Sequence, residues 1–279
     1  MKQKQIARIL AVLLVLCLLP GWSSIASAAG TDIDVKVDDD GFACGADVAT
    51  SGSTELEAGK ITVESAHGDA TGIKSYYNSG SSESEVDSIR VTAPDMRANG
   101  IDIQGQSGTT DIEVSGDITA DGGHRGTGIK IGNEGGETEV EVTGNVNASA
   151  EIDESDGIYI SSSGGKTDVK VDGDVSAEGG VFSFGIEAFV NAGEVTVEVG
   201  GDVSADSEDF GTGVDITARG DSETTVKVEG DITGSDFGVE IAAIEDADVT
   251  LEAENITGEN ESGLNITEAG DNAKVEALI

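Results

Sequence analysis

Apolar and polar residues alternate along most of this chain in short runs. Typical runs place Val or Ile at every second position, as in Ile101/Ile103 and Val140/Val142, with a polar residue between them. A period of two is typical of a β-strand that buries one face. The abundance of Gly and of β-branched residues disfavours helices. The pattern therefore predicts an all-β chain made of many short strands.

These runs recur at a nearly fixed spacing, which is marked by a Gly followed by an aliphatic residue. The pair returns every 28 or 29 residues from Gly72 to Gly213, and then twice after 25 residues. The pairs are Gly72-Ile73, Gly100-Ile101, Gly128-Ile129, Gly157-Ile158, Gly185-Ile186, Gly213-Val214, Gly238-Val239 and Gly263-Leu264, with Gly45-Ala46 as a weaker first member. Such regular self-similarity indicates a repeat architecture.

Each repeat contains three alternating stretches. The first is Gly-Ile-x-Ile, the second is x-Val-x-Val as in Val169/Val171, and the third is Gly-Asp-Val-Ser-Ala as in 173–177. Three strands per repeat predict a parallel β-helix or solenoid of about 8–9 coils of about 28 residues. At the strand spacing of about 4.8 Å, the coils would form a rod roughly 40 Å long. A sandwich of hairpins is the alternative, although hairpins do not require so constant a period.

The Gly-Ile-x-Ile and Gly-Asp-Val-Ser-Ala blocks resemble the right-handed parallel β-helix, or β-solenoid, repeat proteins of bacterial secreted and surface type. The resemblance covers residues from about 45 to 279. It implies the right-handed sense of the coil and an exported protein. In some enzymes of this architecture, acids and bases on an outer face perform polysaccharide cleavage.

The first 28 residues match a secretory signal peptide. Lys2, Lys4 and Arg8 precede an apolar run over 9–19, which is too short to span a bilayer, and Ala26-Ser27-Ala28 fits a signal-peptidase site. We expect cleavage after Ala28 and a secreted or cell-surface protein whose solenoid covers 29–279. We expect its first coil to be ill-defined and its C-terminal end to lack a cap. No later apolar stretch is long enough to cross a membrane.

The charge of the chain excludes several function classes. It has 55 acidic and 15 basic residues, a formal net charge of −40. We expect no binding to nucleic acid, because contacts with phosphate groups need Lys and Arg. Two Cys and two His are too few for a zinc site or a disulfide framework. We expect no cofactor, apart from weak Ca²⁺ binding.

Calcium is the functional interpretation of an acidic corner in the third stretch. One repeat position, directly after a Gly, carries Asp117, Asp174, Asp202 and Asp231. Stacked carboxylates repel one another, and Ca²⁺ prefers oxygen ligands. The alternative is a structural corner, because Gly permits tight turns and Asp bonds nearby N–H groups.

A second set is the outward column of the first strand, which mixes charges, an amide and a Tyr. Its members are Asp102, Lys130, Tyr159, Glu187, Asp215, Glu240 and Asn265. We expect a solvated face here, because paired carboxylates are common in so acidic a chain. No catalytic residue is assigned.

Two further sets are candidates for partner binding. Phe182, Phe184, Phe210 and Phe237 precede the Gly-aliphatic pairs of three successive coils, where we expect loops. They predict either an exposed patch or a cap over the core. Arg219-Gly220-Asp221 matches the tripeptide that integrins read, in a loop between the first and second strands.

The sequence thus favours an exported, non-enzymatic repeat module, the structural or adhesive part of a cell-surface or secreted protein. Its partner would be a host or cell-envelope surface molecule or a polysaccharide. The alternative is a carbohydrate-active enzyme on a pectate-lyase-like scaffold, or a polysaccharide-binding protein.

Overall fold

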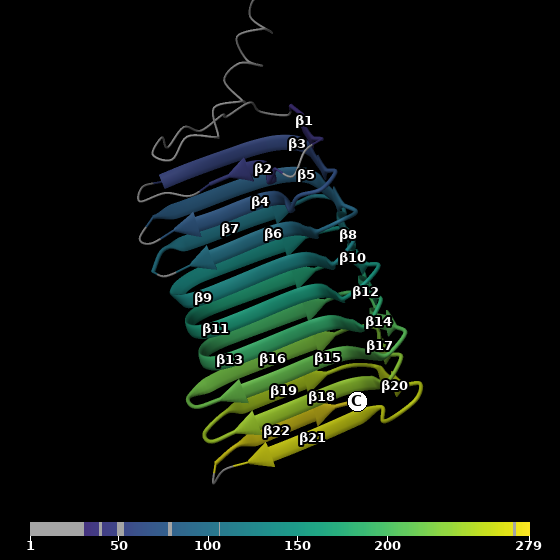
Figure 1. The fold of residues 1–279 in the computed structure, drawn as a ribbon. Coiled ribbons are helices and arrows are strands. Elements are labelled where there is room, and N and C mark those ends of the chain that lie inside the picture. Colours follow the sequence, from purple (N-terminus) through teal and green to yellow (C-terminus); the bar gives the residue numbers. More distant parts are fainter. Residues whose placement is uncertain (1–30, 39–40, 49–52, 78–79, 106, 270–271) are drawn as a thin grey trace, which may run out of the picture.

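The chain forms one continuous parallel β-solenoid (Figure 1). The computed structural model describes residues 31–38, 41–48, 53–77, 80–105, 107–269 and 272–279. The predicted signal peptide, 1–28, lies outside these residues. Consecutive parallel strands about 28 residues apart stack into about eight turns. The predicted fold class is therefore confirmed, and the pairings between described strands exclude the hairpin sandwich because they are parallel.

The three stretches of the repeat form three stacks of strands along the rod. First-stretch strands are β2 (Ala43–Asp47), β4 (Ala70–Tyr77), β6 (Arg97–Gly105), β15 (Phe210–Arg219), β18 (Phe237–Ile244) and β21 (Leu264–Ala269). Second-stretch strands are β7 (Thr109–Val114), β16 (Ser222–Val228), β19 (Asp248–Glu252) and β22 (Lys274–Leu278). Third-stretch strands are β1 (Ile33–Val37), β8 (Ile118–Gly122), β10 (Val146–Ala150), β12 (Val175–Gly179), β14 (Val203–Ser207), β17 (Asp231–Gly234) and β20 (Asn255–Gly258).

Elsewhere two stretches run together as one bent strand. The first and second stretches merge in β9 (Arg125–Val142), β11 (Glu154–Val171) and β13 (Phe182–Val199). The second and third merge in β3 (Ser53–Ser65) and β5 (Ser81–Ala93). In these five strands, the boundary between two stretches is a bend rather than a loop. The described residues contain no helix with the length and apolarity that a membrane crossing requires.

The core is a shaft of aliphatic side chains that stack in register. Ile101 pairs with Ile129, and Ile129 pairs with Ile158, and all three are fully buried. Burying one such side chain contributes about 1.5–3 kcal/mol. Because a single coil cannot cover its own apolar side, each coil depends on its neighbours. The weak first member also fits the stack, since Ala46 pairs with Ile73.

The repeated Gly marks a corner where the strand bends. A Cβ at Gly157 would overlap the inward side chain of Val175 and the carbonyl oxygen of Gly185, so only Gly fits. Gly157 and the buried Ile158 therefore both face the core, which breaks the alternation of a straight strand. As a consequence, the side chains on either side of the pair, Asp156 and Tyr159, both lie on the outer side of the bend, where both contact Arg125.

A second corner is closed by a ladder of Asp and Asn side chains. Oδ1 of Asp117 accepts the backbone N–H of Asn145 (2.8 Å), and Oδ1 of Asn145 accepts that of Asp174 (2.8 Å). In the same way, Oδ1 of Asp174 accepts the backbone N–H of Asp202 (2.9 Å), and Oδ1 of Asp202 accepts that of Asp231 (2.8 Å). Each side chain thus binds the next coil, which accounts for the Gly-Asp repeat in structural terms.

This ladder predicts that an amide can replace a carboxylate in it. Asp174→Ala removes the acceptor for the Asp202 N–H and should lower the free energy of unfolding by about 1 kcal/mol. Asp174→Asn should leave it unchanged or raise it slightly, since Asn145 already performs this role. Urea denaturation of both variants measures the difference. Equal destabilisation by Ala and Asn would contradict the ladder.

Candidate functional site

The outer surface that flanks the Gly-aliphatic pairs is the most distinctive surface of the rod, and we call it the glycine-corner face. Among the described side chains, it carries eight Phe and Tyr residues. They are Phe42, Tyr76, Tyr159, Phe182, Phe184, Phe189, Phe210 and Phe237. Since strands β2 to β21 are in register, these rings recur along one side of the solenoid instead of being scattered over it.

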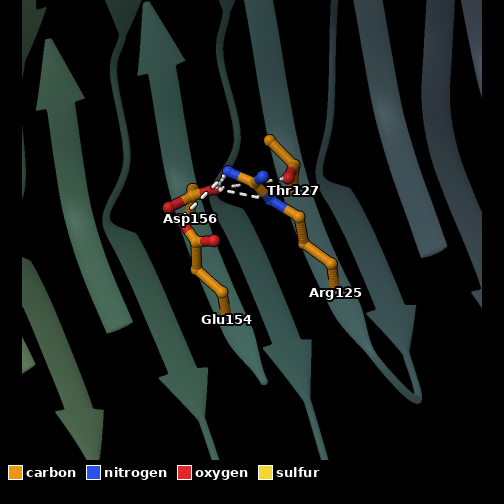
Figure 2. A network of polar contacts seen from close by, with 4 residues as sticks. All are labelled: Arg125, Thr127, Glu154 and Asp156. Atoms are coloured by element: carbon orange, nitrogen blue, oxygen red, sulfur yellow. Dashed lines mark hydrogen bonds and ion pairs between the residues drawn. The ribbon is translucent and has the colours of Figure 1, made fainter. Parts of the chain in front are cut away.

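An ion cluster occupies the middle of this face, on β9 and β11. Nη2 of Arg125 donates to Asp156 Oδ2 (2.7 Å) and to Glu154 Oε1 (3.0 Å), and Nε also reaches Asp156 Oδ2 (3.2 Å). Thr127 adds a longer hydroxyl contact to the same oxygen (3.4 Å). Figure 2 shows the guanidinium reaching across from β9 to the two carboxylates on β11. The plane of Arg125 also lies over the ring of Tyr159, 5.4 Å from its centroid.

The carboxylates of this cluster are unusually desolvated for an outer surface. Asp156 is fully buried, and its Oδ1 has no hydrogen-bond partner among the described residues. Burial raises the pKa of Asp156 to about 6, although Arg125 opposes the shift. Burial, with Asp156 and Glu154 nearby, raises the pKa of Glu187 to about 8. Asp215 stacks next to Glu187, and its pKa is raised to about 6 by burial and by Glu240.

The expectation of a solvated column is wrong for part of it. Glu187 and Asp102 are only 7 % and 8 % exposed. The bend at each Gly brings neighbouring outward side chains together, so that they shield one another from water. Other members remain open, since Asn265 is exposed and donates to Glu240 (2.8 Å).

Three carboxylates of this cluster lie close enough together to be compared with a metal site. Oxygens of Glu154, Asp156 and Glu187 lie within 4.8 Å of one another. Arg125, however, already donates to Glu154 and Asp156, so it supplies the positive charge between them. A cation would have to displace this guanidinium. The geometry therefore describes a buried ion-pair network, with Glu187 as its protonated neighbour near neutral pH.

The four predicted Phe residues meet on this face, C-terminal to the ion cluster. They lie at the beginning of β13, β15 and β18, so the expectation that they occupy loops is wrong. Phe210 contacts three rings, those of Phe182 (6.2 Å between centroids), Phe184 (6.2 Å) and Phe237 (5.7 Å). We call these four residues the phenylalanine cluster. Phe184 is buried but does not belong to the aliphatic shaft, whereas Phe182 is 45 % exposed.

The other predicted sites lie away from this face. Asp117, Asp174, Asp202 and Asp231 form the backbone ladder described above, and their carboxylates are not part of the close acidic group at Glu187. Arg219 ends β15, and Gly220 has a left-handed φ of 60° in the turn before β16. Arg219-Gly220-Asp221 is thus in the predicted connection, and its recognition by an integrin stays a prediction.

Comparisons with known proteins gave no assignment. Neither the protein-family models, nor the curated proteins, nor the solved structures produced a significant match.

Calcium binding at the acidic ladder also stays a prediction, and chelation tests it. If Ca²⁺ bridges Asp174 and Asp202, removal of the ion with a chelator at low salt should lower the melting temperature of the protein. If the backbone N–H groups alone satisfy these carboxylates, the melting temperature should not change. The second outcome would end the calcium hypothesis.

The raised pKa of Glu187 predicts an unusual pH dependence of stability. The folded protein holds this proton up to about pH 8, whereas the unfolded chain releases it near the ordinary value of 4.5. Stability from this group is therefore complete below pH 4.5 and is lost as the pH rises toward 8, by up to about 4 kcal/mol. Glu187→Gln should stabilise the protein at pH 8 and change little at pH 5, measured by urea denaturation.

A matched control separates this effect from the general charge of the chain. Glu198 lies in the second stretch of the same strand, on the exposed side. Glu198→Gln removes the same charge but should show no comparable gain between pH 5 and pH 8. Equal gains for the two variants would show that overall repulsion, and not burial of Glu187, determines the pH dependence.

Proposed function

We propose that this protein is an exported, non-enzymatic adhesive module of a cell-surface or secreted protein, and that it attaches to a polysaccharide through its glycine-corner face. The observation that carries the proposal is the concentration of Phe and Tyr on this one outer face. Aromatic rings outside the core usually mark a binding surface in a soluble protein. Export is supported by the signal-peptide pattern of the first 28 residues.

The form of the molecule suits attachment. The register of the coils repeats equivalent outward positions along the axis, which provides an extended surface for an extended ligand. Phe182 is half-exposed and is supported from the side by Phe210, so a ring is held in place before a ligand arrives. The formal net charge of −40 keeps such rods apart in solution.

One observation favours a second function, glycoside hydrolysis. Asp156 and Glu187 are neighbouring carboxylates, and burial raises the pKa values of both, to about 6 and about 8. A glycosidase uses two carboxyl groups in this way, one protonated and one ionised. Against this function, Asp156 is fully buried and paired with Arg125, so it does not face a substrate. We therefore place binding ahead of hydrolysis.

Incubation with a panel of insoluble acidic and neutral polysaccharides tests the two functions together. We expect the protein to be retained on at least one polysaccharide and to release no reducing ends. Phe182→Ser should reduce this retention severalfold with little change in melting temperature, because the ring is half-exposed. Phe184→Ser should lower the melting temperature instead, because that ring is buried.

Leu278→Ser provides the control, since Leu278 is 49 % exposed on β22, in the second stretch. It should leave retention unchanged. Retention that is equal in wild type and Phe182→Ser would contradict attachment through the face. Release of reducing ends that is abolished by Glu187→Gln would favour the hydrolase.

A further inference from the structure

The N-terminal end of the glycine-corner face contains a pocket of about 250 Å³ between β2 and β9. It is smaller than the roughly 300–1,000 Å³ of sites that enclose drug-sized ligands, so its occupant would be a single small unit. The lining of the pocket ends on β9, whereas the phenylalanine cluster begins two coils farther along the rod, on β13. Its lining differs from the rest of the rod in its content of basic residues.

Basic residues gather in this pocket although the chain has few of them. Lys74, Arg97, Arg125 and Lys130 all line it, out of 15 Lys and Arg in the whole sequence. Arg125 is committed to Asp156 and Glu154. In contrast, Lys74, Arg97 and Lys130 make no salt bridge with a described carboxylate, while exposed lysines elsewhere do, such as Lys36 with Glu64 (2.7 Å). Basic side chains without a carboxylate partner, in so acidic a chain, indicate a place for an anionic group.

A nearly buried acceptor lies among these cations. Asp102 is in register between Lys74 on β4 and Lys130 on β9, and it is 8 % exposed. Its Oδ1 has no hydrogen-bond partner among the described residues. A buried carboxylate oxygen without a donor is costly, and a ligand hydroxyl that donates to the part of Asp102 lining the pocket would offset this cost. Because Asp69 lines the pocket together with Asp102, two carboxylates there repel anions, and a ligand with one negative charge fits better than one with two.

One side of the pocket is aromatic, whereas the rest of its lining is polar or charged. Nζ of Lys74 lies over the rings of Phe42 (5.2 Å to the centroid) and Tyr76 (4.6 Å). Phe42 and Tyr76 are 49 % and 41 % exposed, so the parts of these rings that Lys74 does not cover are open to the C–H groups of a small ligand. Together, the three features select a molecule with one negative charge, hydroxyl donors and an apolar face.

We propose that this pocket binds a monoanionic sugar unit, that is, a uronic acid or a hexose with one sulfate ester. The anionic group contacts Lys74, Arg97 and Lys130, a hydroxyl donates to Asp102, and the ring lies against Phe42 and Tyr76. This inference rests on the proposed function in one respect. If the glycine-corner face holds polysaccharides, the pocket would select the acidic ones among them.

Calorimetric titration of the full chain with monosaccharides tests the pocket without a polymer. We choose 150 mM NaCl, where the screening length of about 8 Å suppresses repulsion by the rest of the chain. Glucuronate should bind at least tenfold more tightly than glucose, which lacks only the carboxylate. It should also exceed acetate, which has no hydroxyl for Asp102. Titration with glucose 6-sulfate shows whether the pocket prefers a sulfate ester to the carboxylate of glucuronate. Binding of either acidic sugar supports the proposal.

Variants locate the binding. Lys130→Met and, as an independent second variant, Arg97→Gln should each weaken glucuronate at least fivefold. Lys166→Met is the control, because Lys166 is an exposed lysine on β11 that pairs with Asp168 (2.6 Å) outside the pocket. Asp102→Asn should weaken glucuronate and leave acetate unchanged.

The pocket proposal would be overturned if glucose bound as tightly as both acidic sugars, if no sugar bound, or if both pocket variants bound like wild type. Its failure is distinguishable from failure of the proposed function. Phe182→Ser should keep full affinity for glucuronate, since Phe182 lies outside the pocket. Loss of polymer retention with intact glucuronate binding would therefore reject only the adhesive role, and the reverse result would reject only the pocket.

Discussion

The close stacking of one coil on the next is the constraint on which the rest of the structure depends. Equivalent residues of successive coils pair in parallel register, so that an inward residue at one position needs a residue that can be buried at the same position of the next coil. Most of these residues are aliphatic, and Ser84 between Leu56 and Ile112 is an exception. The Gly before each Ile is part of this constraint. At Gly157 a Cβ would overlap both an inward side chain and the backbone of the next coil, so the corner has no space for any larger residue. The same bend also brings outward groups together on the glycine-corner face.

The fold could be predicted because its determinants are local and repeated. The spacing of the Gly-aliphatic pairs indicated the length of a coil, and period-two alternation indicated which side chains face the core. The aligned Ile101, Ile129 and Ile158 confirm both inferences. The merging of two stretches into β9, β11 and β13 was not predicted, because a bend at a Gly-rich segment and a loop look alike in sequence.

The site was only partly predictable. The column that contains Glu187 and Asp102 was recognised, but alternation alone suggests that an outward side chain is solvated. Its burial arises from the shape of the corner, which the sequence does not show. Arg125 and Asp156 were missed for a related reason. They are 31 positions apart, and only the register of β9 with β11, together with the bend, brings the guanidinium to the carboxylate. The sequence does contain one usable signal, an Arg and an Asp on positions that flank equivalent Gly-Ile pairs.

The two kinds of order in this molecule have different physical origins. The Asp and Asn ladder uses each side chain to bind the backbone of the next coil, and so its repetition serves stability. The glycine-corner face departs from repetition: the position in register with Arg125 is Glu154 in the next coil, and then Phe182 and Phe210. Some of these replacements also hold neighbouring coils together, because Arg125 pairs with Glu154 and the ring of Phe182 contacts that of Phe210. A ligand that lies along the axis would meet a different side chain at every coil, and such variation on a constant scaffold is how a repeat protein acquires specificity.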